Sequence, residues 1–177
     1  MSAQSSIPTQ PADGPHELIW PEWVYPYPAG ILGGLLGGAA VALVGAAYGL
    51  ISGIGLWAPV NLVAAVLLRD MQAQSMGTIS QFNLPALMVG LIIHALMSVT
   101  LGVMFVFILP ALPGRPLFWG PVIGPLLWVG AFVAALPIIN PIMAANVEMV
   151  SFTIANLAYG LVLGWWIDRT PMIHMEH

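Results

Sequence analysis

Four long apolar segments, separated by short polar or proline-rich stretches, dominate the pattern of residues along the chain. An α-helix needs about 20 predominantly apolar residues to cross the hydrocarbon core of a bilayer. Because lipid offers no hydrogen-bond partners to main-chain groups, such segments are expected to be helical. The pattern predicts an all-α integral membrane protein with four transmembrane helices, at residues 29–51, 84–109, 117–139 and 147–167.

A fifth apolar segment, residues 56–68, is too short to cross a bilayer comfortably. Pro59 stands where a helix would begin, and Arg69 and Asp70 close the segment. It is predicted to form a half-helix that either re-enters the membrane or lies at its surface. A hydrophilic stretch, residues 71–82, follows it, and Asn83 is the predicted N-cap of the second span.

The two ends of the chain differ from its middle and divide it into three parts. Residues 1–28 form an arm that is polar and then rich in proline and aromatic residues, a composition that favours an extended chain over a helix. Residues 29–168 form the transmembrane domain, and residues 169–177 form a short C-terminal tail. Within the domain, Pro137 is predicted to bend the third span near its end.

Four crossings place both termini on the same side of the membrane. That side would hold Arg115 and Arg169, and the other side would hold Arg69. Because cytoplasmic loops carry the excess of positive charge, both termini are predicted to be cytoplasmic. The side with the termini would also carry a belt of aromatic residues at headgroup level: Trp20, Trp23, Phe118, Trp119, Trp165 and Trp166.

The composition supports a membrane protein and excludes several classes of function. Of the 177 residues, 59% are hydrophobic and 6% are charged, whereas an ordinary soluble domain has about 25% charged residues. Three arginines and no lysine make no basic patch, so nucleic acid is not an expected partner. The absence of cysteine excludes disulfides and thiolate metal sites. Without a phosphate loop, a nucleophile–base pair or clustered metal ligands, the chain is predicted to have no catalytic residues and no metal site.

Glycines recur at four-residue intervals in two of the predicted spans. Small residues at this spacing lie along one ridge of a helix and let another backbone approach closely. The ridge is predicted either to dock another subunit or to contact the chain's own second or fourth span. Its members are Gly30, Gly34, Gly38, Gly45 and Gly49 in the first span, and Gly160 and Gly164 in the fourth.

His94 is the one histidine inside a predicted span, in a row of residues spaced four apart. An ionisable residue at membrane depth is a functional candidate. Three roles suit it: an axial haem ligand, a hydrogen-bond partner for a quinone, or a proton relay. A fourth interpretation is structural, as a neutral imidazole bonded to Asn156 or to a carbonyl of a neighbouring helix. The row consists of Ala86, Gly90, His94, Ser98 and Gly102.

Haem is disfavoured because its binding between helices usually takes two histidines. The other three, His16, His174 and His177, lie in the arm and the tail, so one chain cannot supply a second histidine at membrane depth. No cofactor is therefore predicted, although His94 leaves contact with a haem or a quinone open.

Polar residues near the broken segments suggest a possible path through the membrane. Asn61 follows Pro59, and Asn140 precedes Pro141, as in paired half-helices that line some transport pathways. Glu148 begins the fourth span, where the helix dipole favours a carboxylate, and it could instead serve a proton or cation path together with Asn156.

Three segments resemble a group of small, mostly uncharacterised bacterial membrane proteins. They are Gly-Leu-Trp-Ala-Pro-Val-Asn-Leu-Val-Ala-Ala at 55–65, Pro-Leu-Phe-Trp-Gly-Pro-Val-Ile-Gly-Pro-Leu-Leu-Trp at 116–128, and Ile-Asn-Pro-Ile-Met at 139–143. The resemblance covers about residues 29–168 and implies association with respiratory complexes of the haem-copper oxidase or alternative complex III type. It implies the bacterial inner membrane as the location, and it transfers no functional residue.

Together these features predict a non-catalytic accessory subunit of a larger membrane complex, respiratory or otherwise energy-transducing. Its partners would be other integral membrane subunits and lipid. The alternative is a small homo-oligomeric channel or transporter that uses the broken helices near Asn61 and Asn140. A third hypothesis is a quinone- or haem-binding anchor that uses His94.

Overall fold

Four long helices make up most of the protein. The computed structural model describes residues 22–175. The long helices are α1 (Tyr27–Ile51), α4 (Leu84–Ile108), α5 (Pro116–Ala134) and α8 (Met149–Asp168). Each is long and apolar enough to cross a membrane. The all-α fold with four spans is confirmed, and the chain has the architecture of a multi-pass membrane protein.

Capping residues determine where two of these helices begin. The Asn83 side-chain oxygen accepts a hydrogen bond from the Ala86 N–H at 3.1 Å, so the predicted N-cap of the second span is confirmed. The Glu148 carboxylate caps α8 by accepting from the N–H groups of Val150 and Ser151 at 2.8 and 2.6 Å. Both side chains satisfy donors that the first turn of a helix leaves unpaired.

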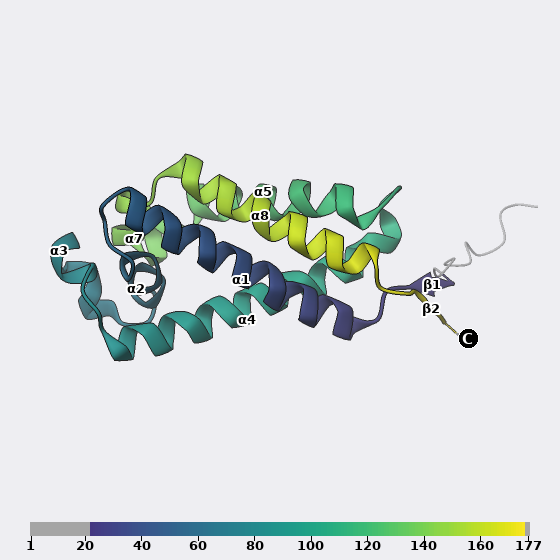
Figure 1. Ribbon diagram of the computed structural model, residues 1–177, viewed down its shortest axis with the longest axis horizontal. Helices are drawn as coiled ribbons and strands as arrows, with labels where there is room; N and C mark the ends of the chain where they lie inside the picture. Colours follow the sequence, from purple (N-terminus) through teal and green to yellow (C-terminus); the bar gives the residue numbers. More distant parts are fainter. Residues whose placement is uncertain (1–21, 176–177) are drawn as a thin grey trace, which may run out of the picture.

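The four helices pack as a curved row in the order α5, α8, α1, α4. Helix α8 packs along α5 on one side and along α1 on the other, and α1 packs along α4. Helices α4 and α5, at the two ends of the row, touch at few points. Figure 1 shows α1 across the middle of the molecule between α8 and α4, with α5 crossing behind α8.

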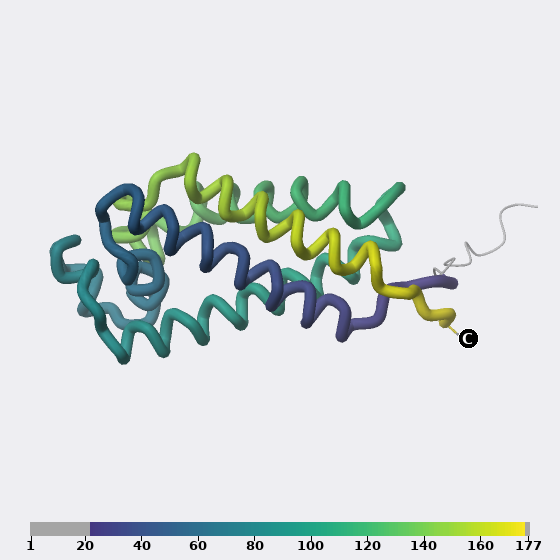
Figure 2. The backbone as a smooth tube through the Cα atoms, in the orientation of Figure 1, coloured from purple at the N-terminus to yellow at the C-terminus, as the bar shows by residue number. Residues whose placement is uncertain are grey.

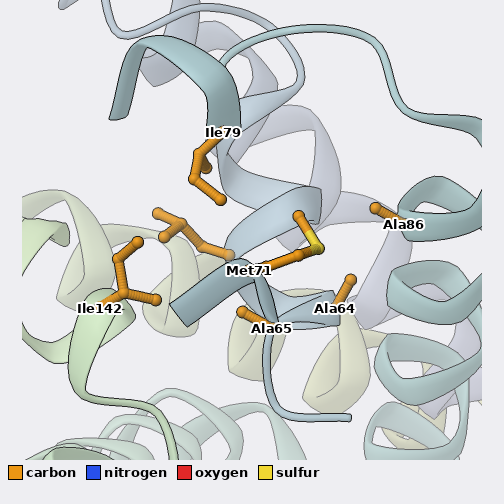
Figure 3. Close-up of a cluster of buried hydrophobic side chains, with 7 residues drawn as sticks. Ala64, Ala65, Met71, Ile79, Ala86 and Ile142 are labelled. Atoms are coloured by element: carbon orange, nitrogen blue, oxygen red, sulfur yellow. The ribbon is translucent and has the colours of Figure 1, made fainter. Parts of the chain in front are cut away.

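Short helices close the end of the bundle opposite the termini. They are α2 (Ala58–Ala64), η1 (Arg69–Ala73), α3 (Met76–Ile79), α6 (Leu136–Ile139) and α7 (Pro141–Asn146). The half-helix after the first span is present as α2, which packs mainly against α4. Seven buried apolar side chains at this end form a cluster (Figure 3): Leu62, Ala64, Ala65, Met71, Ile79, Ala86 and Ile142.

The other end of the bundle joins the arm to the tail. Strand β1 (Trp23–Val24) pairs antiparallel with β2 (Ile173–His174), and the Trp23 ring meets the His174 ring edge-on at 5.1 Å. The tube in Figure 2 shows both described ends leaving the bundle together. The described parts of the arm and the tail, predicted as separate segments, therefore pair in a two-stranded sheet. One member of the predicted aromatic belt, Trp20, lies outside the described residues. The histidines His16 and His177 of the arm and the tail also lie outside them.

The third span is shorter than predicted. Helix α5 ends at Ala134, not at residue 139, and Pro137 lies in the first turn of the next short helix, α6 (Leu136–Ile139). Pro137 has no N–H to bond the Val133 carbonyl four residues earlier, and its ring crowds that carbonyl. The chain therefore leaves the helix at Ala135 and restarts as the short helices α6 and α7. The other spans begin and end within two residues of their predicted limits.

Glycines on two sides of α1 explain the order of the row. A Cβ on Gly30 would stand 2.7 Å from the Gly102 oxygen of α4. On the other side, a Cβ on Gly37 would stand 2.8 Å from the Tyr159 ring of α8. Only glycine permits such an approach, so α1 can be sandwiched between α4 and α8.

The other ridge glycines also face the chain's own elements, and all but Gly45 do so closely enough to exclude a Cβ. Gly34 and Gly38 face Ser98 of α4, and Gly160 and Gly164 face Gly120 and Pro116 of α5. Further along α1, Gly45 faces Pro59 and Gly49 faces Gly55, beside α2. Of the two predicted uses of the ridge, the structure contains the contact with the chain's own helices.

Replacing Gly34 by leucine should destabilise the bundle. The new side chain would overlap the Ser98 carbonyl and the Val99 backbone of α4, and overpacking costs about 1–3 kcal/mol. The control is Gly130→Leu in α5, where a Cβ would have no neighbour within 4 Å. The free energy of unfolding in mixed micelles measures both, and equal stability of the two variants would contradict the packing described.

Candidate functional site

An apolar cavity of about 290 Å³ lies between α1, α2, α4 and the start of α8. It forms because α1 and α4 are no longer in contact between His94 and the end of the bundle that carries α2. There α1 contacts the α2 region through Gly45 and Gly49, and α4 contacts Val60 of α2 through Gly90. The half-helix therefore separates two helices that are in close contact elsewhere, and a space remains beside it.

Aromatic and aliphatic side chains form most of the cavity wall. Three rings contribute to it, those of Tyr48, Trp57 and Phe152. Leu56 and Leu91 also line the cavity and are 40% and 47% exposed, so the cavity reaches the outer surface of the bundle. In a membrane that surface faces lipid. The cavity is therefore accessible to molecules dissolved in the bilayer.

His94 lines this cavity from α4. Its Nε2 lies 2.8 Å from the Gly38 carbonyl oxygen of α1. Since a carbonyl can only accept a hydrogen bond, Nε2 carries the proton. The partner is thus a main-chain carbonyl of a neighbouring helix and not Asn156, whose amide donates to the Phe152 carbonyl of its own helix at 2.8 Å.

The buried side chains of Asn61 and Asn140 hold the half-helix α2 in place through hydrogen bonds. The Asn61 amide donates to the carbonyls of Ile79 and Gln81 at 2.7 and 2.9 Å. The Asn140 amide donates to the Leu62 carbonyl at 2.7 Å. The two side chains are 1% and 0% exposed and neither lines the cavity. The structure places both asparagines at α2, where their hydrogen bonds connect α2 to the neighbouring short segments.

The other two members of the predicted polar path lie on α8. Glu148 is exposed and engaged in capping, and Asn156 is buried and bonded to its own helix. Hydrogen bonds from the main-chain N–H groups of Ser151 and Val150 lower the pKa of the Glu148 carboxyl. Neither residue is hydrogen-bonded to Asn61 or Asn140 within residues 22–175.

A buried tyrosine contributes a bond that the sequence analysis missed. The Tyr159 hydroxyl of α8 donates to the Ser98 carbonyl of α4 at 2.6 Å, passing α1 between the two helices. The available signal was a tyrosine within an apolar span, since a buried hydroxyl needs a hydrogen-bond partner. Its partner depends on the register of three helices, which the sequence pattern does not specify.

Charged side chains lie at the two ends of the bundle. Arg115 forms a two-bond pair with Asp168, at 3.1 and 2.6 Å, that ties α5 to α8 at the end with the termini. This pairing raises the pKa of Arg115. Arg169 stacks over the Trp165 ring at the same end. Arg69, at the opposite end, donates to the Ile139 carbonyl at 2.7 Å.

A family of unknown function, DUF6789, matches residues 26–176 of the chain. The chain belongs to this family. No curated protein matches it, and no solved structure matches it. The part of the chain that matches DUF6789 contains all four long helices, the half-helix and every residue of the cavity. Within residues 22–175, no group of three or more histidine and acidic side chains is placed to hold a metal ion.

The bond between Tyr159 and Ser98 should contribute measurably to stability. Tyr159→Phe removes a buried donor and is expected to lower the free energy of unfolding by about 1 kcal/mol. Tyr48→Phe is the matched control, because the Tyr48 hydroxyl has no hydrogen-bond partner among the described residues. Unfolding in mixed micelles compares the two. A larger effect at Tyr48 would show that the bond is unimportant.

The cap of α8 should make stability depend on pH. The folded pKa of Glu148 lies below its usual value of 4.5, so the carboxylate stabilises the fold above that value. This contribution is lost as pH falls through the folded pKa. Between about pH 6 and about pH 3 the melting temperature should fall more for the natural protein than for Glu148→Gln. Parallel melting curves would exclude a contribution from this carboxylate.

Proposed function

We propose that this DUF6789 protein is a non-catalytic accessory subunit of a larger membrane complex, of the respiratory or another energy-transducing kind. The observation that carries the proposal is the open side of the helix row. Helices α4 and α5 both pack on their inner neighbours and hardly on each other. They leave an apolar groove between them, lined by Leu96, Met97, Thr100, Leu101, Leu127, Trp128 and Ala131.

The groove has the features of a seat for a transmembrane helix of another subunit. Within lipid, helices associate through van der Waals packing and not through exclusion of water. A groove flanked by two helices offers more packing surface than a single convex helix. Thr100 already donates its hydroxyl to the Leu96 carbonyl at 2.8 Å, so this hydroxyl presents no unpaired donor to an apolar partner.

The positions of the other features favour this role over a channel. The glycine ridge of α1 is occupied by the chain's own elements, whereas the groove is open to a partner. The asparagines of the alternative pathway are buried and bonded to main-chain carbonyls. Their amides stabilise α2, a role that requires no permeant ion.

The orientation follows from the arginines. Arg115 and Arg169 lie at the end with the termini, and Arg69 lies at the other. By the positive-inside rule, the proposal places both termini in the cytoplasm. With the bacterial inner membrane as the location, the partner would be an integral subunit of a complex there.

Filling the groove should release the partner. Ala131→Trp places a large ring in the groove. We expect the yield of co-purified chains to fall about tenfold, which corresponds to a loss of about 1.4 kcal/mol in binding free energy. Val133→Trp is the control, because Val133 is on the same helix, 64% exposed and outside the groove. Mass spectrometry of chains that co-purify in mild detergent gives the yields.

Two results would overturn the proposal. The first is a natural protein that purifies as a stable monomer with no other chain. The second is an equal loss of partners in Ala131→Trp and Val133→Trp, which would place the contact elsewhere. Co-purification of copies of this chain alone would replace the accessory subunit by a homo-oligomer.

A further inference from the structure

The cavity beside α2 has no part in the proposed contact through the groove. It contains a single imidazole in a wall that is otherwise almost wholly apolar. A polar group held in such surroundings is costly unless it is bonded. His94 meets this cost at one nitrogen, through the Gly38 carbonyl. The other nitrogen is the group that a ligand could use.

The bond to Gly38 determines the chemistry of that second nitrogen. A neutral imidazole has one N–H donor and one acceptor. Because Nε2 is the donor, Nδ1 is an acceptor, and no group within residues 22–175 donates a hydrogen bond to it. A ligand that fits this position must therefore bring a donor. A carbonyl compound cannot bond there, because its oxygen and Nδ1 are both acceptors and their lone pairs would repel each other.

Ser151, one of four further polar side chains of the wall beside Tyr48, Trp57 and Asn146, also offers an acceptor. The Ser151 hydroxyl donates to the Glu148 carbonyl at 2.9 Å, so its hydrogen is already engaged and its lone pairs remain. Acceptors are thus available on both α4 and α8. A ligand hydroxyl can donate to these acceptors, and it can also accept from the Tyr48 hydroxyl or the Trp57 indole N–H, neither of which has a hydrogen-bond partner among residues 22–175.

The size and the walls indicate the rest of the ligand. A cavity of about 150 Å³ holds a benzene ring, and this one is about 290 Å³. It therefore has room for a ring with several alkyl substituents. Tyr48, Trp57 and Phe152 offer ring faces and edges to an aromatic guest. Such a guest would enter from the bilayer, past Leu56 and Leu91.

We propose that this cavity binds a lipid-soluble phenol or hydroquinone, held by a hydrogen bond from its hydroxyl to Nδ1 of His94. The ring lies among the aromatic residues of the wall, and the alkyl substituents point toward the bilayer. The proposal adds a ligand site to the proposed accessory subunit. It does not depend on the groove between α4 and α5, because the cavity is lined by other residues.

The test is binding of four probes that share one carbon skeleton. Thymol has one hydroxyl, thymohydroquinone has two, para-cymene has none, and thymoquinone has two carbonyls in place of hydroxyls. Titration calorimetry of the full chain in mild detergent, corrected with protein-free micelles, gives the dissociation constants. Because one hydrogen bond separates the probes, thymol and thymohydroquinone should bind about three- to tenfold more tightly than para-cymene and thymoquinone.

Variants separate the hydrogen bond from the cavity. His94→Leu should reduce the ratio of the para-cymene to the thymol dissociation constant to about one, since it removes the acceptor and leaves the space. Gly45→Leu should abolish binding of all four probes. A Cβ at Gly45 has only the Pro59 side chain near it, at 3.7 Å, so the leucine extends into the cavity without meeting backbone. Gly130→Leu, in α5 and away from the cavity, is the matched control and should bind like the natural protein.

Three outcomes would overturn the proposal. Equal affinities of thymol and para-cymene in the natural protein would remove the role of His94. Unchanged thymol binding in Gly45→Leu would place the ligand outside the cavity. Heats no larger than those of protein-free micelles would show that no site exists. If His94→Leu does not fold, the probe series and Gly45→Leu still decide the question.

Discussion

Contact between backbones, made possible by glycine, is the interaction on which the rest of the fold depends. In lipid there is no water to exclude, so helices associate through close packing and hydrogen bonds. Glycines on two sides of α1 bring α4 and α8 within backbone contact of it. The same proximity brings main-chain carbonyls within reach of side chains on other helices. The bonds from His94 to Gly38 and from Tyr159 to Ser98 both follow from it.

The cavity follows from where this contact stops. Beyond His94, glycines of α1 and α4 contact the region of the half-helix and no longer each other. The half-helix is held in place by Asn61 on one side and Asn140 on the other. A short element wedged between long ones cannot fill the whole space, and apolar side chains line what remains. The buried asparagines are thus positioning residues for a cavity that they do not touch.

The four spans could be predicted from the sequence, but the helix against which each span packs could not. Long apolar runs and the cap at Asn83 specify local structure, and the helices they predict are present. The predicted end of the third span, residue 139, is wrong because the helix is interrupted at Ala135, two residues before Pro137. The pairing of β1 with β2 could not be predicted, because strands of two residues are too short to show an alternating hydrophobic pattern in the sequence. Spacing shows that a glycine ridge contacts something, but the partner and the acceptor for His94 depend on the register between helices.

Helix α4 borders both the groove and the cavity, which raises the question of whether the two communicate. His94 lines the cavity, and Met97, three residues on, lines the groove. Coupling between sites requires an element with two arrangements that both sites bias. Backbone contact with Gly30 and Gly34, and the bond from Tyr159 to Ser98, leave α4 one position against α1. We therefore expect α4 to act as a fixed wall, so that a ligand in the cavity and a partner in the groove bind independently.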